Sequence, residues 1–171
     1  HIFNFGLSNK NSKKKLFKAF YKKKFFHFNN SFDKKYILNK IKHNYPKIYD
    51  QFEIKSQTLI LKKFDKLNLI TNACFIKIDV EGFDHKVIEG MWNFVKLRKP
   101  VLLIEYNESN FKKIYDKINK FYFCYQYDTD KNKLLKLSEN KIKMLKSGKI
   151  LEKRYVKNSV NIFYINKKRI I

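Results

Sequence analysis

The chain has 171 residues, of which 44% are hydrophobic and 17% aromatic, and it carries a formal net charge of +24. This length and composition suffice for one domain with an apolar core and are too small for two. No apolar run reaches the roughly 18 to 20 residues of a membrane-spanning helix, and no signal peptide pattern is present. These features predict a cytoplasmic protein without a membrane span.

The positive charge is almost entirely lysine, with arginine only at Arg98, Arg154 and Arg169. Proteins that read phosphates and bases specifically depend on the bidentate guanidinium group of arginine. The chain is also rich in Asn, Ile, Phe and Tyr, which share A- and T-rich codons with Lys, so genomic base composition explains the bias. We therefore predict no specific nucleic-acid partner. A basic module that binds nucleic acid or an anionic surface stays open as an alternative.

The first third of the chain has irregular patterning. Residues 1–7 alternate in part and predict a strand. Apolar residues at helical spacing predict one helix within Lys10–Lys24 and a second after Ser31, which Pro46 stops. We treat the chain as a single domain over 1–171, in which 18–57 is interpreted as an insertion or a cap.

The remainder has orderly elements: one helix is predicted after Asp79, Ser109 is expected to cap a second helix, and a short helix over Ser138–Lys146 stays open. Strands are predicted over Thr58–Leu61, Ala73–Asp79, Val101–Tyr106, Phe121–Tyr127 and Val160–Asn166. Continuous apolar strands joined by single helices are typical of strands buried on both faces of a parallel sheet. We therefore predict an α/β fold with a mostly parallel sheet and an antiparallel edge pair made by the last two strands.

Acidic residues stand where two of these strands end. Asp79 and Glu81 follow one strand, and Glu105 ends the next. Ligands of open parallel sheets bind at the carboxyl ends of the strands, and clustered carboxylates there suit a proton, a metal ion or a cationic ligand. A structural role in helix capping or in ion pairs with lysine is equally compatible with the pattern. Asp84 and His85 are adjacent on a predicted helix and point apart, so we predict no metal site.

The string IKIDVEGFDHKVIEG over Ile76–Gly90, followed by KPVLLIEYN over Lys99–Asn107, resembles the carboxyl-terminal signature of FkbM-family methyltransferases. The segments FGLSNKNSKKKLF, LILKKFDKL and NIFYINK resemble that family more weakly. The resemblance implies a Rossmann-like class I methyltransferase fold. It also implies transfer of a methyl group from S-adenosyl-L-methionine to a hydroxyl of a sugar or small metabolite.

Residue roles follow from this resemblance. Asp79 and Glu81 are expected near the methyl group and the acceptor, and Glu105 is expected to bind the acceptor or support its binding. Carboxylates there would orient the hydroxyl and accept its proton. The sequence identifies neither the acceptor nor the oligomeric state.

The cofactor side departs from the family pattern. The turn at Leu7, Ser8 and Asn9 is the segment expected to contact the cofactor. A glycine-rich turn has no counterpart, because the chain has only four glycines: Gly6, Gly82, Gly90 and Gly148. We therefore expect the amino-terminal part of the fold to be missing and the chain alone to bind S-adenosyl-L-methionine poorly and to be inactive. A non-catalytic descendant of the fold stays open as a further alternative.

Overall fold

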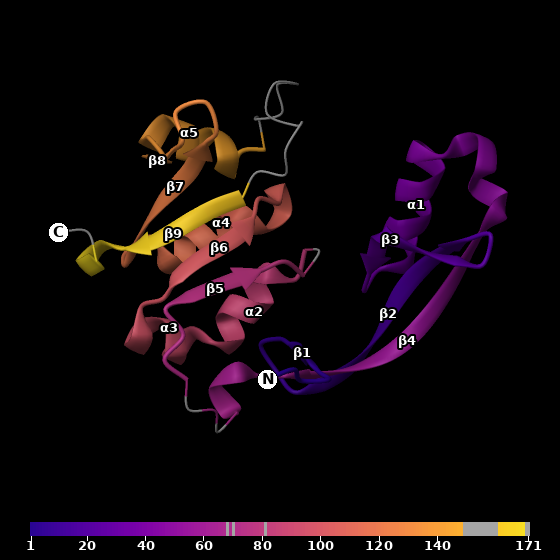
Figure 1. Cartoon of the computed structure of the whole chain (residues 1–171), viewed down its shortest axis with the longest axis horizontal. Helices are drawn as coiled ribbons and strands as arrows, with labels where there is room; N and C mark the ends of the chain where they lie inside the picture. Colours follow the sequence, from indigo (N-terminus) through magenta and orange to yellow (C-terminus); the bar gives the residue numbers. More distant parts are fainter. Residues whose placement is uncertain (68, 70, 81, 149–160, 170–171) are drawn as a thin grey trace.

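A computed structural model describes every residue of the chain except 68, 70, 81, 149–160 and 170–171. The described residues form a mixed α/β structure with two separate sheets (Figure 1). We call the five-stranded sheet with its helices the body, and we call residues 12–62, which project from it, the arm. The amino terminus lies where the two meet, and the 3-10 turn at Lys167–Arg169, the last described part of the chain, lies on the far side of the body (Figure 1).

The body sheet has the strand order β5-β6-β9-β7-β8. Its strands are β5 (Phe75–Ile78), β6 (Val101–Glu105), β7 (Tyr122–Asp128), β8 (Lys133–Lys136) and β9 (Asn161–Asn166). Only β5 and β6 pair in parallel, and the other three pairings are antiparallel. The prediction of a mostly parallel sheet is therefore wrong for the described strands. The two strands predicted as an antiparallel pair, β7 and β9, do pair antiparallel, but they do not form the edge, because β9 lies between β6 and β7 and the edge strand is β8.

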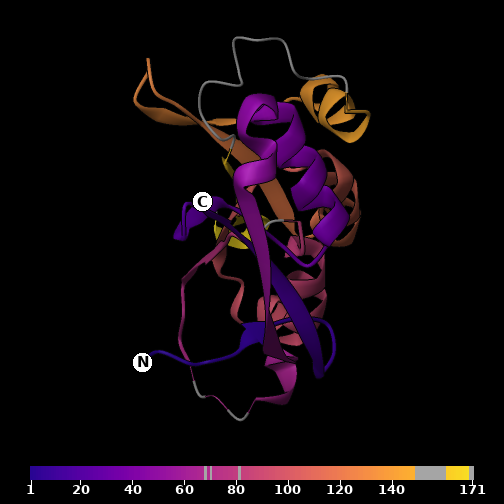
Figure 2. The ribbon, with the colours of Figure 1, turned by 90° about the vertical axis from the view of Figure 1, so that its right-hand side faces the viewer.

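The helices of the body cover one face of this sheet (Figures 1 and 2). They are α2 (Asp84–Gly90), α3 (Trp92–Arg98), α4 (Glu108–Ile118) and α5 (Glu139–Lys146), with 3-10 turns at Phe64–Lys66 and Lys167–Arg169. The single helix expected after Asp79 is divided at Met91 into α2 and α3. The short helix left open over Ser138–Lys146 forms as α5, in which the Ser138 hydroxyl accepts a hydrogen bond from the backbone N–H of Lys141 at 3.3 Å. The expectation that Ser109 caps the helix after β6 is wrong, because α4 begins earlier, at Glu108. No helix in the described part of the chain is long and apolar enough to cross a membrane.

The core of the body lies between the helices and this one face of the sheet. Its buried side chains alternate along the strands, as Leu102 and Ile104 do in β6, and they pack against Val87, Ile88 and Phe111 of the helices. The opposite face of the sheet is more open: Val101 and Leu103 are half-buried, and Phe75 is 49% exposed. The expectation that the strands are buried on both faces is therefore wrong for the described residues.

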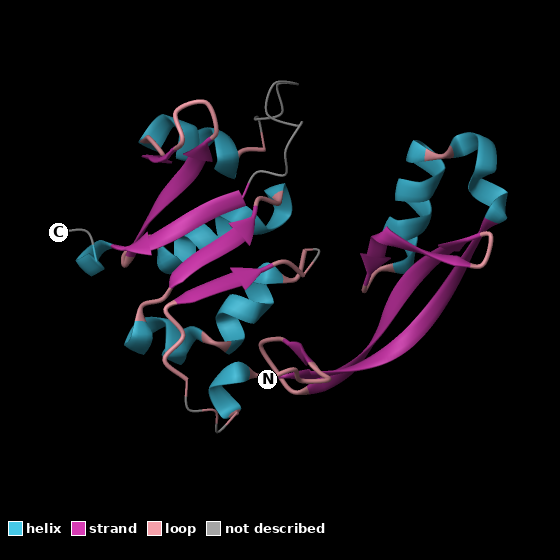
Figure 3. Ribbon diagram, in the orientation of Figure 1, coloured by secondary structure: helices cyan, strands magenta, loops and turns pink. Residues whose placement is uncertain are grey.

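The arm consists of three long strands and one helix, which Figure 3 shows apart from the body sheet. Strands β2 (Ser12–Tyr21), β3 (Lys24–Ser31) and β4 (Phe52–Lys62) are antiparallel, and the short β1 (Gly6–Leu7) adds to β4 in parallel. Helix α1 (Lys34–Asn44) and a 3-10 turn (Pro46–Gln51) connect β3 to β4. The helix predicted within Lys10–Lys24 is wrong, since this segment is β2 and the turn into β3. The helix predicted after Ser31 is confirmed as α1.

A small second core holds the outer part of the arm together. Ala19, Ile37 and Ile41 are fully buried there, and a set of aromatic and apolar side chains packs against them: Phe17, Phe26, Tyr45, Tyr49, Phe52 and Ile54. Residues 18–57 make up this outer part, and their interpretation as an insertion or a cap stays a prediction.

Candidate functional site

The carboxyl ends of β5 and β6 bring two of the predicted acidic residues together. These strands are parallel and Ile78 pairs with Ile104, so Asp79 and Glu105 occupy the next positions along neighbouring strands. The Asp79 carboxylate forms an ion pair with the Lys77 amino group at 3.0 Å, and its side chain is 46% exposed. Glu105 is half-buried. Glu81 lies outside the described residues.

A tight turn links β5 to α2. The Phe83 N–H donates to the Val80 carbonyl oxygen at 3.2 Å, and Gly82 has a φ of +93°. This left-handed conformation strains residues that carry a Cβ atom and is open to glycine. The glycine of the signature therefore has a local structural reason, which is to let the chain turn from the strand into the helix beside Asp79.

Asp84, in the first turn of α2, is a buried acid that the sequence did not single out as a site residue. It is only 2% exposed, and its two carboxylate oxygens accept weak hydrogen bonds at 3.4 Å from the Val80 N–H and from the Asn110 side-chain amide. Burial raises the pKa of Asp84, and the nearby Asp79 adds to this effect, while backbone hydrogen bonds oppose it. Through its hydrogen bond from the Val80 N–H, Asp84 thus stabilises the turn that follows Asp79.

A sequence signal for this burial exists. Asp84 lies on the same helical stripe as Ile88, Met91 and Val95, all of which are buried. The spacing of one helical face therefore places Asp84 toward the core, where a carboxylate needs hydrogen-bond partners. Its partner Asn110 is also only 2% exposed and lies in the first turn of α4, the helix that follows the neighbouring strand.

His85, which follows Asp84 in α2, is half-buried. Its Nδ1 atom is buried and has no hydrogen-bond partner among the described residues. Burial lowers the pKa of His85, and the positive charge of Lys113 adds to the shift. These effects favour a neutral imidazole. Nowhere in the described part of the chain do three or more His, Cys, Asp or Glu side chains cluster closely enough to hold a metal ion.

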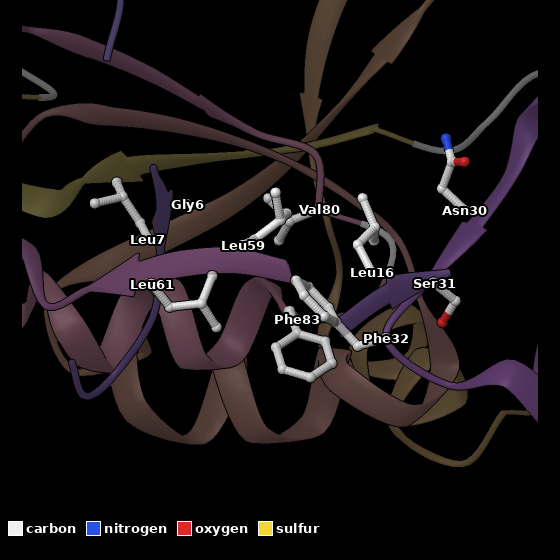
Figure 4. A pocket seen from close by; sticks show the side chains of 10 residues that line it. All are labelled: Gly6, Leu7, Leu16, Asn30, Ser31, Phe32, Leu59, Leu61, Val80 and Phe83. Atoms are coloured by element: carbon white, nitrogen blue, oxygen red, sulfur yellow. The ribbon is translucent and has the colours of Figure 1, made fainter. Parts of the chain in front are cut away.

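An apolar pocket lies beside the same turn, between the arm and the body (Figure 4). Its volume is about 200 Å³. Val80 and Phe83 come from the turn after β5, and the other lining residues come from the arm and β1: Gly6, Leu7, Leu16, Asn30, Ser31, Phe32, Leu59 and Leu61. Figure 4 shows Val80, Leu59 and Leu16 around the pocket, with the Phe32 and Phe83 rings next to each other. Their ring centroids are 4.5 Å apart.

The predicted cofactor turn is only partly at this pocket. Leu7 lines the pocket, whereas Ser8 and Asn9 contact helix α2. Ser8 is 3% exposed, and a Cβ atom added at Gly90 would lie 2.0 Å from the Ser8 carbonyl oxygen. The Asn9 amide donates to the Glu89 carboxylate at 2.8 Å. The second signature glycine, Gly90, therefore allows α2 to approach the backbone at Ser8.

The comparison with known families decides what kind of protein carries this site. The sequence profile of the Methyltransferase FkbM domain matches residues 4–130 of the chain. The chain belongs to the FkbM methyltransferase family. The matched range of this FkbM domain includes the arm, the pocket and both strand ends with Asp79 and Glu105. No curated protein and no solved structure matches the chain.

Membership of the FkbM family gives the acidic strand ends a chemical context. A methyltransferase must orient an acceptor and manage the proton that the acceptor loses. In this FkbM domain, an accessible carboxylate at Asp79 and a half-buried one at Glu105 lie at neighbouring strand ends, and the turn after Asp79 contributes Val80 and Phe83 to an apolar pocket. This arrangement can bind a small molecule by its apolar part and a polar group together.

Proposed function

We propose that this FkbM domain methylates a hydroxyl group of a sugar or small metabolite, with S-adenosyl-L-methionine as the methyl donor. Family membership supports methyltransferase activity. The observation that carries the choice of site is the parallel pairing of β5 and β6, which puts Asp79 beside Glu105 at the strand ends. Open α/β sheets bind their ligands at this end of the strands.

The apolar pocket does not fit a whole S-adenosyl-L-methionine molecule. The pocket of about 200 Å³ is smaller than the roughly 300 to 1,000 Å³ of typical cofactor sites, and its lining is almost entirely apolar. The backbone at Ser8 is covered by helix α2, which approaches it closely at Gly90. We therefore assign this site to the acceptor.

In this proposal the carboxylates act on the acceptor hydroxyl. Asp79 is accessible at the strand end, so it is our choice for the group that accepts a hydrogen bond from the hydroxyl and takes up its proton. Glu81 and Glu105 are proposed to hold the acceptor. Asp84 is a positioning residue, since it binds the Val80 N–H and so fixes the turn that follows Asp79.

The test is methyl transfer from labelled S-adenosyl-L-methionine to a panel of alcohols and saccharides, measured in the native protein that carries this sequence. D79N is expected to lower the transfer rate about 100-fold, the usual order for loss of a general base. The matched control is D116N, which removes another ion-paired carboxylate, one that lies 2.6 Å from the Lys146 amino group on the helical side of the body. Equal rates for D79N and D116N would show that Asp79 is not the proton acceptor.

A further inference from the structure

Two lysine amino groups gather at the apolar pocket. The Nζ atoms of Lys14 in β2 and Lys86 in α2 lie 4.4 and 4.7 Å from the centre of the Phe83 ring, which lines the pocket. Lys14 also lies 5.4 Å from the Phe32 ring, another part of the lining. One cation from the arm and one from the body therefore stand beside the same aromatic ring.

These two cations lack an acidic partner in the described structure. The ion pairs found there join other residues, and none involves Lys14 or Lys86. Partial burial lowers the pKa of Lys14, and the positive charges of Lys86 and Lys10 add to the effect. Like charges held close together repel each other, and an anion bound between them would relieve the repulsion.

We propose that the pocket binds an amphiphilic anion, whose apolar group enters the pocket and whose phosphate or carboxylate group binds Lys14 and Lys86. The apolar lining offers Leu16, Leu59 and Val80 to the first group. A volume of about 200 Å³ has room for roughly six carbon-sized groups, at about 30 Å³ each, the share of a water molecule in the liquid. That this ligand is the methyl acceptor rests on the proposed function, and the acceptor is then an anionic alcohol with an apolar segment.

The general basicity of the chain does not produce this arrangement. Successive side chains of a strand point to opposite faces, so Lys13 and Lys15 lie on the face of β2 away from Lys14. Lys13 pairs in register with Ile60, which is 49% exposed, whereas Lys14 pairs with Leu59 of the pocket. Lys13 is therefore a matched control for Lys14, with the same charge in the same strand.

The binding test is calorimetric titration of the native protein with hexyl phosphate, hexanoate, hexanol and inorganic phosphate. We expect one site for the two amphiphilic anions and weaker binding of hexanol and inorganic phosphate. K14M keeps the unbranched stem and removes the charge, and it is expected to weaken hexyl phosphate binding about fivefold, as for loss of one exposed charge pair. K13M is expected to change it less than twofold. Equal losses for K13M and K14M, or equal affinity for hexyl phosphate and inorganic phosphate, would overturn the proposal.

A second variant tests the apolar half of the site. L59Q puts a polar amide into the pocket and is expected to weaken the binding of hexyl phosphate without affecting the binding of inorganic phosphate. An equal effect on the binding of both would overturn the proposed pocket. If no alcohol is methylated but this binding pattern is observed, the proposed function is wrong and the proposed anion-binding site still holds. Transfer to neutral alcohols that hexyl phosphate does not inhibit would show that the acceptor binds elsewhere.

Discussion

The body and the arm differ most in how much apolar surface each buries. In the described residues the body core contains sixteen buried side chains, while the arm core contains three, Ala19, Ile37 and Ile41. Burial is the main source of folding free energy, so the arm depends more on its strand pairing and on contacts with the body. The apolar pocket of the candidate site lies between these two regions. The position of the arm on the body therefore determines the shape of the pocket.

The largest effect is expected where the body meets the chain that leads into the arm. G90A would place a Cβ atom 2.0 Å from the carbonyl oxygen and 2.7 Å from the carbonyl carbon of Ser8, and a backbone cannot move aside as a side chain can. We expect a loss of about 3 kcal/mol in the free energy of unfolding, measured by urea denaturation. G6A is the control, because its Cβ would meet only the end of the Leu61 side chain, at 2.8 Å. A G90A loss no larger than that of G6A would contradict this packing.

A second prediction concerns the pH dependence of the body. Burial raises the pKa of Asp84 above its ordinary value of 3.8, so the folded chain holds this proton to a higher pH than the unfolded chain. The contribution of Asp84 to the free energy of unfolding therefore falls as the pH rises from about 3.8 to the raised folded-state pKa, and it stays lower above that value. D84N lacks this contribution. Its stability relative to the wild type should increase with pH across this window in urea titrations from pH 3.5 to 8. A difference that does not change with pH would be inconsistent with the buried acid.

The smallest of these effects is expected in the arm. Lys22 and Lys23 form the two-residue turn between β2 and β3, and both have positive φ values, 48° and 64°. Two-residue hairpin turns of this kind favour Asn-Gly, since other residues are strained there. The double variant K22N/K23G should raise the free energy of unfolding by about 1 kcal/mol. K34N/K35G, made in the first turn of α1, should lower it. Destabilisation by the turn variant would show that the hairpin is formed differently.

The same turn explains why the arm was difficult to predict from sequence. A Lys-Lys pair gives no turn signal, so β2 and β3 were not separated. Phe17, Phe20 and Tyr21 in β2 also have helix-like spacing, although the strand places them on both of its faces. The pairing of β2 with β4 joins residues as far apart as Ser12 and Leu61. Such long-range partners leave no local pattern.

Prediction succeeded better in the body because its elements have turn residues at their ends. Pro100 stands before β6, Ser138 caps α5, and Gly82 lies in the turn after β5. The insertion of β9 between β6 and β7 was missed, since strand order is a tertiary property. At the site, the neighbouring positions of Asp79 and Glu105 agree with the expectation that carboxylates cluster where two strands end, although two helices and not one join these strands. The role of the arm in lining the pocket was not predicted, because Leu16 and Leu59 are far from Val80 in the sequence and come together with it only in the folded structure.

The central claim is that the acceptor binds where the arm meets the carboxyl ends of β5 and β6. Its most direct test is a backbone NMR titration of the native protein with the alcohol that it methylates best. The account predicts that chemical shifts change most at Leu16, Asp79, Val80 and Phe83, and least in the β7–β8 hairpin at the far edge of the sheet. The largest changes at that hairpin, with Val80 and Phe83 unaffected, would contradict it.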